Sequence, residues 1–110
     1  MNKIKPSVIG LGYVGLPVFI RLKKKYKTIG YDKNPLRIKY LKAKKDLNSE
    51  FKVLDLKLLN RSKFTNSAKD LKDSNFFIIT VPTPLIKKTL PDLSALRTAF
   101  IEISKYIKKG

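Results

Sequence analysis

Three glycines stand within six residues directly behind an apolar run, in the stretch VIGLGYVGLP. Gly10, Gly12 and Gly15 match the pattern G-x-G-x-x-G between an expected strand and an expected helix, the context in which it indicates dinucleotide binding. Gly10 would allow a sharp exit from the strand, Gly12 a close approach of the backbone to a diphosphate, and Gly15 tight helix packing. The N–H groups at the helix start, from about Tyr13 and Val14, would bind phosphate oxygens with the positive end of the helix dipole behind them. The alternative is a glycine turn that serves packing alone.

Three further side chains could contact such a cofactor. Asp32 ends the second expected strand, 22 residues after Gly10, where a carboxylate can accept hydrogen bonds from the adenosine ribose. Its charge would repel a 2′-phosphate and favours NAD over NADP, although Arg37, five residues on, could accommodate that phosphate. Thr83 lies just beyond the fourth expected strand, where ligands of open α/β sheets bind. The alternatives are a helix cap for Asp32, in competition with Asn34, a surface charge for Arg37 and a turn residue for Thr83.

The elements that position these residues alternate between strand and helix. We expect strands at residues 7–11, 28–31, 63–65 and 75–81, and helices at residues 13–25, 35–44, 94–109 and, in one or two turns, 67–72. A short amphipathic helix is expected within residues 46–60, and a loop at residues 82–94, which hold three prolines. The alternation predicts an α/β fold of the Rossmann type: a parallel sheet in the order 3-2-1-4 with flanking helices, forming one domain over residues 1–110.

Burial is expected to follow the apolar pattern of each element. The run 75–81 reads as a strand buried on both faces. Asn34 and Pro35 are the expected cap and first residue of the second helix, and Asp92 or Ser94 the expected cap of the last. Apolar stripes are expected on the first helix and on the last, at Val14, Val18, Phe19 and Leu22, and at Leu96, Phe100, Ile103 and Ile107.

Composition narrows the function further. The chain carries 25 Lys and Arg against 8 Asp and Glu, a net charge of +17, which favours anionic partners in general. A basic module that binds nucleic acid or an anionic surface is therefore a rival interpretation, although Tyr26, Tyr31 and Tyr40 lack the spacing of an RNA-binding sheet. The absence of Cys and His makes a transition-metal site unexpected. No apolar run approaches the roughly 20 residues of a membrane span, and we expect a cytoplasmic protein.

The motifs VIGLGYVGLP, GYDKNPLRI, FFIITVPTP and PDLS together resemble the N-terminal NAD-binding domain of the UDP-glucose/GDP-mannose dehydrogenase family, over residues 3–110. The VPTP and PDLS wording is more similar to dehydrogenases of UDP-N-acetylhexosamines from capsular and Vi-type polysaccharide biosynthesis. The resemblance implies NAD as cofactor. The matching motifs also imply that the candidate residues named above contact the cofactor: Gly10, Gly12, Tyr13, Val14, Gly15, Asp32, Arg37 and Thr83.

The resemblance also implies an activity and a gap in it. Members of the family oxidise the C6 alcohol of a nucleotide sugar to a carboxylate in two hydride transfers to NAD, with a cysteine that holds the aldehyde intermediate. This chain has no cysteine, and it matches only the front part of the family's pattern. We therefore expect no dehydrogenase activity from it alone, and a UDP-sugar as partner only where further domains are supplied. A complementing chain of a split enzyme and a homo-oligomer are both open.

Overall fold

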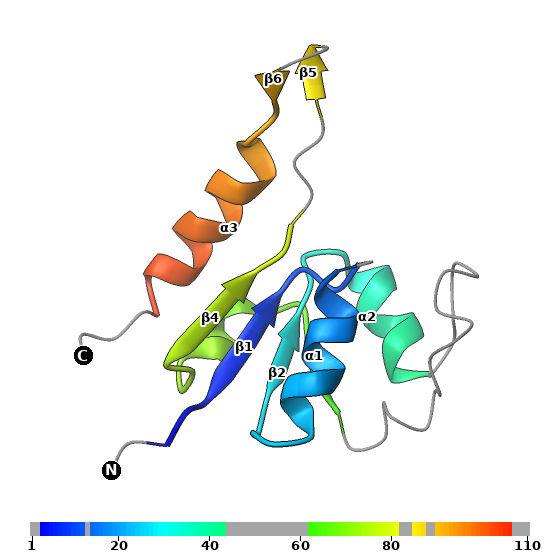
Figure 1. Ribbon diagram of the computed structural model, residues 1–110, viewed down its shortest axis with the longest axis vertical. Coiled ribbons are helices and arrows are strands. Elements are labelled where there is room, and N and C mark those ends of the chain that lie inside the picture. Colours follow the sequence, from blue (N-terminus) through cyan, green and yellow to red (C-terminus); the bar gives the residue numbers. More distant parts are fainter. Residues whose placement is uncertain (1–2, 13, 44–61, 82–84, 88–89, 107–110) are drawn as a thin grey trace.

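The computed structural model describes residues 3–12, 14–43, 62–81, 85–87 and 90–106. Four parallel strands form one sheet in the order β3-β2-β1-β4, as the sequence predicts (Figure 1). The strands are β1 (Pro6–Ile9), β2 (Ile29–Tyr31), β3 (Lys63–Thr65) and β4 (Phe76–Ile79), and the helices are α1 (Gly15–Lys23), α2 (Pro35–Lys42), the 3₁₀ helix η3 (Ala68–Leu71) and α3 (Ser94–Ser104).

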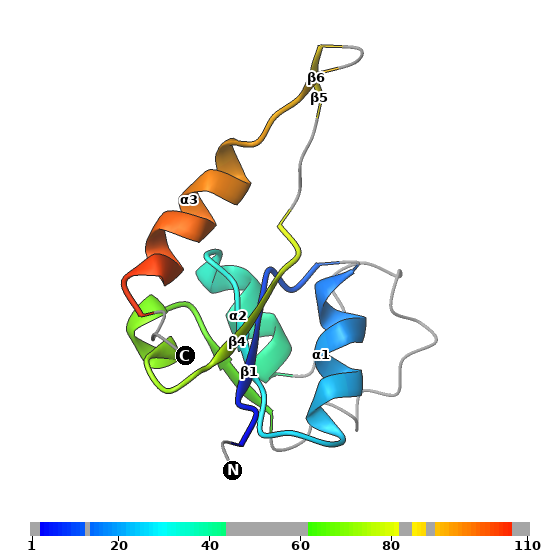
Figure 2. The ribbon, with the colours of Figure 1, turned by 60° about the vertical axis from the view of Figure 1, so that its left-hand side comes forward.

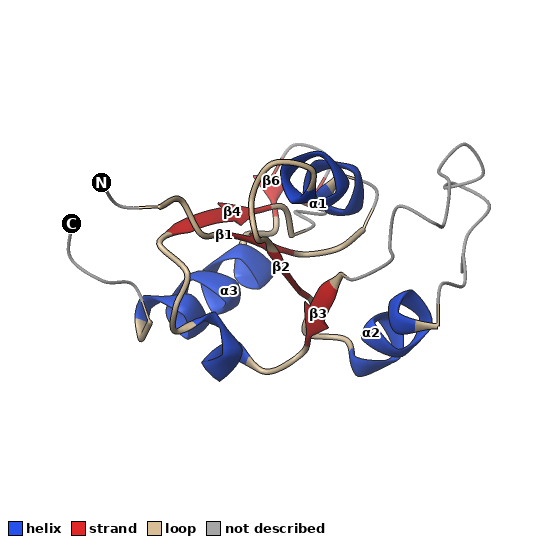
Figure 3. Cartoon of the chain, turned by 90° about the horizontal axis from the view of Figure 1, so that it is seen from below, coloured by secondary structure: helices blue, strands red, loops and turns tan. Residues whose placement is uncertain are grey.

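Helices cover both faces of the sheet (Figure 3). The central strand β1 presents Val8 to one face and Ile9 to the other, so both faces have an apolar core. One core lies between the sheet and α1 and α2, and it includes Val8, Phe19 and Phe64. The second lies between the sheet and η3 and α3, and it includes Ile9, Leu71 and Ile103. The sheet is therefore the middle layer of three, with its strand ends open to solvent or to a ligand.

The N-terminal half follows the local signals closely. Pro35 is the first residue of α2, and the N–H of Leu36 donates to Asn34 Oδ1 at 3.0 Å, so the predicted cap is confirmed. The first helix begins at Gly15, later than expected, and Val14 precedes it with 63% of its surface exposed. The prediction that Val14 belongs to the buried stripe was therefore wrong, whereas Phe19 is fully buried.

The prediction that the fourth strand is buried on both faces was also wrong. Phe76 is 51% exposed, and the rest of β4 is only half-buried. The cause is its place in the sheet: β4 pairs with β1 alone and forms an edge of the sheet. Burial on both faces requires neighbours that this strand does not have among the described residues.

A short hairpin interrupts the expected loop at residues 82–94. Strands β5 (Leu85–Lys87) and β6 (Leu90–Pro91) pair antiparallel, and the hairpin extends away from the sheet (Figure 2). Proline is tolerated here because both strands of a two-stranded ribbon are edge strands, where one N–H is not needed for pairing. From the hairpin the chain returns along α3 to the sheet (Figure 1).

The last helix packs through only part of the predicted stripe, which includes Ile103 but not Phe100. Ala99 and Ile103, one turn apart, are buried, Leu96 is half-buried, and Phe100 is 56% exposed. Leu93 is the N-cap residue, and Asp92 Oδ1 accepts hydrogen bonds from the Ser94 N–H and hydroxyl at 2.9 and 2.6 Å. The expected helix within residues 46–60 lies outside the described residues, as do residues 107–110.

Candidate functional site

The carboxyl end of β1 turns sharply at Gly10, between the ends of β2 and β4. Gly10 has a φ of 98°, in the left-handed region that favours glycine. Its N–H donates to the carbonyl of Tyr31 at 2.7 Å, and the N–H of Thr80 donates to the carbonyl of Ile9 at 2.7 Å. These bonds continue the sheet pairing to its last residue and fix the position of the turn.

The other two glycines of the motif have different surroundings. A methyl group at Gly15 would overlap the carbonyl oxygen of Gly10 and the hydroxyl of Thr80, so the close approach of α1 to β1 requires glycine there. A methyl group at Gly12 would meet no atom of the described residues within 4 Å, its chain neighbours aside, and Gly12 has no positive φ. The fold therefore explains Gly10 and Gly15 but gives no reason for glycine at residue 12.

The start of α1 faces the same opening. The first hydrogen bond of the helix runs from the Leu16 N–H to the carbonyl of Gly12 at 3.2 Å. The N–H groups of Val14 and Gly15 precede that bond and so have no acceptor within the helix. Together with the positive end of the helix dipole, they form a local environment that favours an anion.

The carboxylate of Asp32 lies at this opening too. Asp32 Oδ2 accepts a hydrogen bond from the Leu11 N–H at 2.9 Å, and Oδ1 accepts one from the Asn34 N–H at 3.0 Å. The cap of α2 is Asn34, so the alternative of Asp32 as the helix cap is wrong. Each carboxylate oxygen keeps a second acceptor position, because one donor occupies only one of its lone pairs. The side chain is thus fixed in place and still able to accept further hydrogen bonds.

Arg37 lies beneath the turn rather than on the surface. Its side chain is buried, with 8% exposure, and Nε donates to the carbonyl of Leu11 at 2.8 Å. The alternative of a plain surface charge is therefore wrong. Arg37 and Asp32 hold the carbonyl and the N–H of the same residue, Leu11, and together they fix the backbone that follows Gly10.

Thr80 is a residue of this site that sequence reasoning missed. Its hydroxyl donates to the carbonyl of Gly10 at 2.7 Å and lies within 3.2 Å of the carbonyl of Ile9. It therefore joins the end of β4 to the glycine turn, about 70 residues earlier in the chain. A hydroxyl residue at the carboxyl end of an expected strand was the available signal. Tyr13 and Thr83, both predicted contacts, lie outside the described residues.

A cavity of about 330 Å³ opens beside Asp32, on the face of the sheet that α3 covers. Its lining combines the ends of β1 and β2 with one face of α3: Ile9, Gly10, Tyr31, Asp32, Lys33, Val81, Ser94, Ala95, Thr98, Ala99 and Glu102. Within it the Tyr31 hydroxyl donates to Glu102 Oε2 at 2.6 Å. Burial, followed by the bond to Glu102 and the negative charges of Glu102 and Asp32, raises the pKa of Tyr31 well above its ordinary value.

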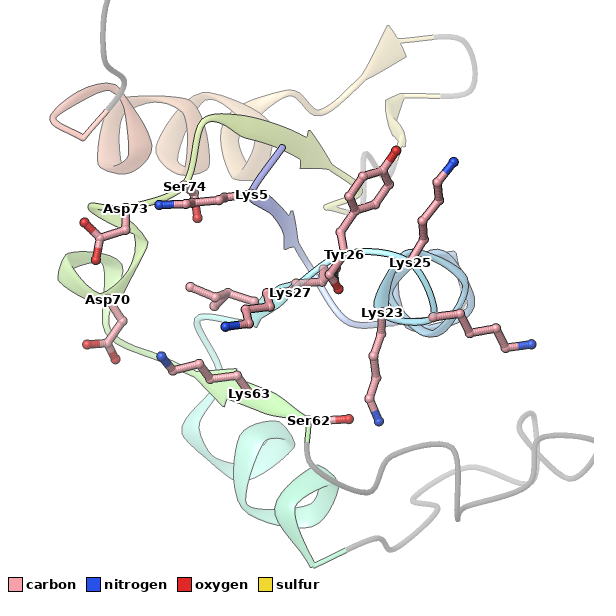
Figure 4. Close-up of a pocket in the computed structure, with 13 residues that line it drawn as sticks. Lys5, Lys23, Lys25, Tyr26, Lys27, Ser62, Lys63, Asp70, Asp73 and Ser74 are labelled. Carbon is pink, nitrogen blue, oxygen red and sulfur yellow. Dashed lines mark hydrogen bonds between the residues drawn. The ribbon is translucent and has the colours of Figure 1, made fainter. Parts of the chain in front are cut away.

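A second cavity, of about 760 Å³, lies at the opposite, amino-terminal edge of the sheet (Figure 4). Lysines and aspartates of its lining are Lys5, Lys23, Lys24, Lys25, Lys27, Lys63, Asp70 and Asp73. The side chains of Lys23 and Lys25 point in different directions, away from the centre of the cavity, while those of Lys5 and Lys63 extend toward the two aspartates (Figure 4). The lysines of this cavity therefore do not converge on one point.

The residues that the structure describes contain no group of three or more His, Cys, Asp or Glu side chains arranged to hold a metal ion. No helix among them combines the length and the apolar character needed to cross a bilayer.

Comparison with known proteins identifies relatives of this chain. A family model described as the UDP-glucose/GDP-mannose dehydrogenase family, NAD binding domain, matches residues 4–110. The chain is 41% identical over 110 residues to a UDP-N-acetyl-D-glucosamine 6-dehydrogenase of Pseudomonas aeruginosa, covering 100% of this chain and 26% of that protein. It is 46% identical over 102 residues to protein CapL of Staphylococcus aureus, covering 92% and 24% of the two chains.

A solved structure agrees with the sequence comparison. The UDP-D-ManNAc dehydrogenase from Pyrococcus horikoshii superposes with a TM-score of 0.82 and 33% identity, over 97% of this chain and 27% of that one. The chain thus spans about a quarter of the length of the relatives that it matches.

Proposed function

The chain belongs to the UDP-glucose/GDP-mannose dehydrogenase family, and on that premise we propose that residues 1–110 form the NAD-binding domain of a nucleotide-sugar 6-dehydrogenase. The substrate class that we propose is a UDP-N-acetylhexosamine, because relatives that are 41% and 33% identical carry the names of such enzymes. A role in polysaccharide biosynthesis and a cytoplasmic location are part of this proposal.

The observation that carries the proposal is the unexplained glycine at residue 12. A Cβ there would lie in space that no described residue other than its chain neighbours approaches within 4 Å, so packing among the described residues does not require glycine at this position. The N–H groups of Val14 and Gly15 border the same space. A diphosphate lying over Gly12 accounts for both features, because it needs a close backbone approach and unpaired donors.

The other residues of the site have complementary roles in this proposal. Asp32 accepts hydrogen bonds from the adenosine ribose hydroxyls through the acceptor positions that its backbone contacts leave. Its charge disfavours a 2′-phosphate, and Arg37, which could have compensated, is buried beneath the turn, where its Nε donates to the carbonyl of Leu11. We therefore assign NAD rather than NADP as the preferred cofactor. Arg37 acts by positioning the turn, and Tyr13 and Thr83 stay proposed contacts by motif.

The chemistry that NAD supplies when bound is the acceptance of a hydride from the C6 position of the sugar. This chain contributes the binding and orientation of the cofactor, and its sequence holds no cysteine for the covalent step. We propose that the chain alone does not oxidise a UDP-sugar, and that the sugar binds only with the additional domains of the family, in one chain or in a complementing one. NADH production from a UDP-sugar by the pure chain would contradict this.

Titration calorimetry with Gly12 variants tests the proposed cofactor site. Gly12→Ala should weaken NAD binding by about ten-fold or more, and Gly12→Val should abolish it, because each added carbon enters the space of the diphosphate. Gly12→Ala should unfold within about 0.5 kcal/mol of the wild type, because the added methyl group meets no described residue other than its chain neighbours.

Two outcomes would contradict the proposal. A folded wild-type chain with no affinity for NAD at millimolar concentration would exclude cofactor binding by this chain alone. Unchanged affinity in Gly12→Val would show that the cofactor, if bound, does not lie over the glycine turn. Circular dichroism of each sample provides the folding control.

A further inference from the structure

The cavity beside Asp32 would receive the base of the cofactor. This placement rests on the proposed function, in which Asp32 binds the adenosine ribose. If Asp32 holds the adenosine ribose, the attached base enters the neighbouring space of about 330 Å³. That volume is at the small end of the range for ligand pockets, which suits one base and its sugar rather than a whole dinucleotide. The polar groups of the cavity therefore decide which base fits.

One face of α3 supplies half of the polar residues that line the cavity. Ser94, Thr98 and Glu102 follow one another at intervals of four residues, so their side chains share a face of the helix. Asp32 and Lys33 also line the cavity. In a chain with 25 basic and 8 acidic residues, this cavity is lined by two acidic residues and one basic one.

Glu102 is held in this wall by a single strong contact. Its Oε2 accepts a hydrogen bond of 2.6 Å from the hydroxyl of Tyr31, a side chain that is only 4% exposed. Burial of Tyr31 raises its pKa, so the phenol stays neutral and acts as the donor at physiological pH. Glu102 is itself half-buried, and within the described part of the chain Tyr31 is its one recorded hydrogen-bond partner. The carboxylate thus has a fixed position and a second oxygen that is available as an acceptor.

We propose that Glu102 determines the base specificity of the site by accepting a hydrogen bond from an exocyclic amino group of the purine. Adenine carries such an amino group at C6. Hypoxanthine carries a carbonyl oxygen at that position, which would face a carboxylate that only accepts. A site built to bond a polar group of its ligand discriminates strongly against an analogue that lacks it. Tyr31 is the positioning residue, since it contacts Glu102 rather than the base.

The test compares binding of NAD with binding of nicotinamide hypoxanthine dinucleotide, by titration calorimetry on the whole chain. The wild type should bind NAD about ten-fold more tightly or better, as expected for a hydrogen bond to a charged group. Glu102→Gln keeps an oxygen for the Tyr31 hydroxyl and offers an amide NH₂ to the cavity, which can donate to the hypoxanthine carbonyl. The preference for NAD should therefore fall to about two-fold or reverse in this variant.

Tyr31→Phe separates base recognition from a structural role. It removes the Tyr31–Glu102 hydrogen bond, which Glu102→Gln retains, but leaves the carboxylate in the cavity, so the preference for NAD should fall only in part and stay above that of Glu102→Gln. If Glu102 serves only to hold α3, Glu102→Gln should keep the wild-type preference, and that result would overturn the inference.

The outcomes also separate this inference from the proposed function. A wild type that binds both dinucleotides equally overturns the role of Glu102 and leaves the cofactor site standing. A folded wild type that binds neither nucleotide refutes the cofactor site, and the base specificity with it.

Discussion

The two ends of the parallel strands, called here the carboxyl edge and the amino edge of the sheet, contrast in how their polar groups are arranged. At the carboxyl edge, Asp32 and Thr80 are fixed by hydrogen bonds to the backbone of the glycine turn, and they surround open space. At the amino edge, many lysines surround a larger cavity, but their side chains point in different directions (Figure 4). The net charge of +17 is a property of the whole surface, whereas a specific site needs groups that converge and are held in place.

The largest effect is expected from Gly15→Ala, which tests the rigidity of the carboxyl edge. The added methyl group would overlap the backbone of Gly10 and the side chain of Thr80, so α1 must move away from β1. We expect a loss of about 3 kcal/mol in the free energy of unfolding, even though alanine is the better helix former. Urea unfolding followed by circular dichroism measures it.

Gly12→Ala is the matched control for that experiment, because it adds the same methyl group three residues earlier without a clash. If Gly15→Ala were as stable as Gly12→Ala, the close packing of the helix on the turn would not be needed for the fold.

Thr80→Val is expected to have the next largest effect. Valine has nearly the same shape but cannot donate to the carbonyl of Gly10, and the loss should be about 1 kcal/mol in the free energy of unfolding. Thr80→Ser keeps the hydroxyl and should lose clearly less. The reverse order would show that the methyl group of Thr80, and not its hydroxyl, holds the end of β4 against the turn.

Thr80 also illustrates where prediction from the sequence ended. The glycine turn, the start of α2 at Asn34 and the strand order depend on local signals and on general rules of α/β folds, and all three could be predicted. The contacts of Thr80 with Gly10 and of Tyr31 with Glu102 join residues about 70 positions apart. No pattern in the chain specifies them, because they exist only once the sheet has brought β1, β2, β4 and α3 together.

Burial failed to follow the apolar pattern for a related reason. Phe76 is half-exposed because β4 is an edge strand, and Phe100 is exposed because α3 turns Ala99 and Ile103 toward the sheet. The pattern of a strand or helix shows which side chains can be buried. Which of them are buried depends on the elements that pack against that strand or helix in the fold.

A smaller effect is expected at Asp92, next to α3, the helix that lines the cavity beside Asp32. Hydrogen bonds from the Ser94 hydroxyl and N–H hold the pKa of Asp92 below its ordinary value. A lowered pKa means that the carboxylate stabilises the fold above about pH 4, and that this contribution is lost as the pH falls through the folded-state value. Asp92→Asn cannot titrate, so the difference in Tm between wild type and variant should be present at pH 6 and shrink toward pH 3.

Because every other carboxylate titrates equally in the two proteins, thermal unfolding at the two pH values isolates the contribution of Asp92. The Tm difference at pH 6 should be smaller than that of Thr80→Val. A difference that grows on acidification would show that the hydrogen bonds to Ser94 do not favour the ionised form.

The smallest effect is expected from removing charge at the amino edge. The triple variant Lys5→Gln, Lys27→Gln and Lys63→Gln lowers the net charge from +17 to +14 but alters nothing at the glycine turn. Affinity for NAD should stay within about two-fold of the wild type, because exposed charges farther away than a Debye length are largely screened at physiological salt.

Binding of nonspecific DNA in a gel shift should weaken more, with a shallower dependence on salt, since that binding follows the number of basic groups. A loss of NAD affinity as large as that of Gly12→Ala would contradict the contrast between the two edges, because general charge would then contribute as much as the convergent site.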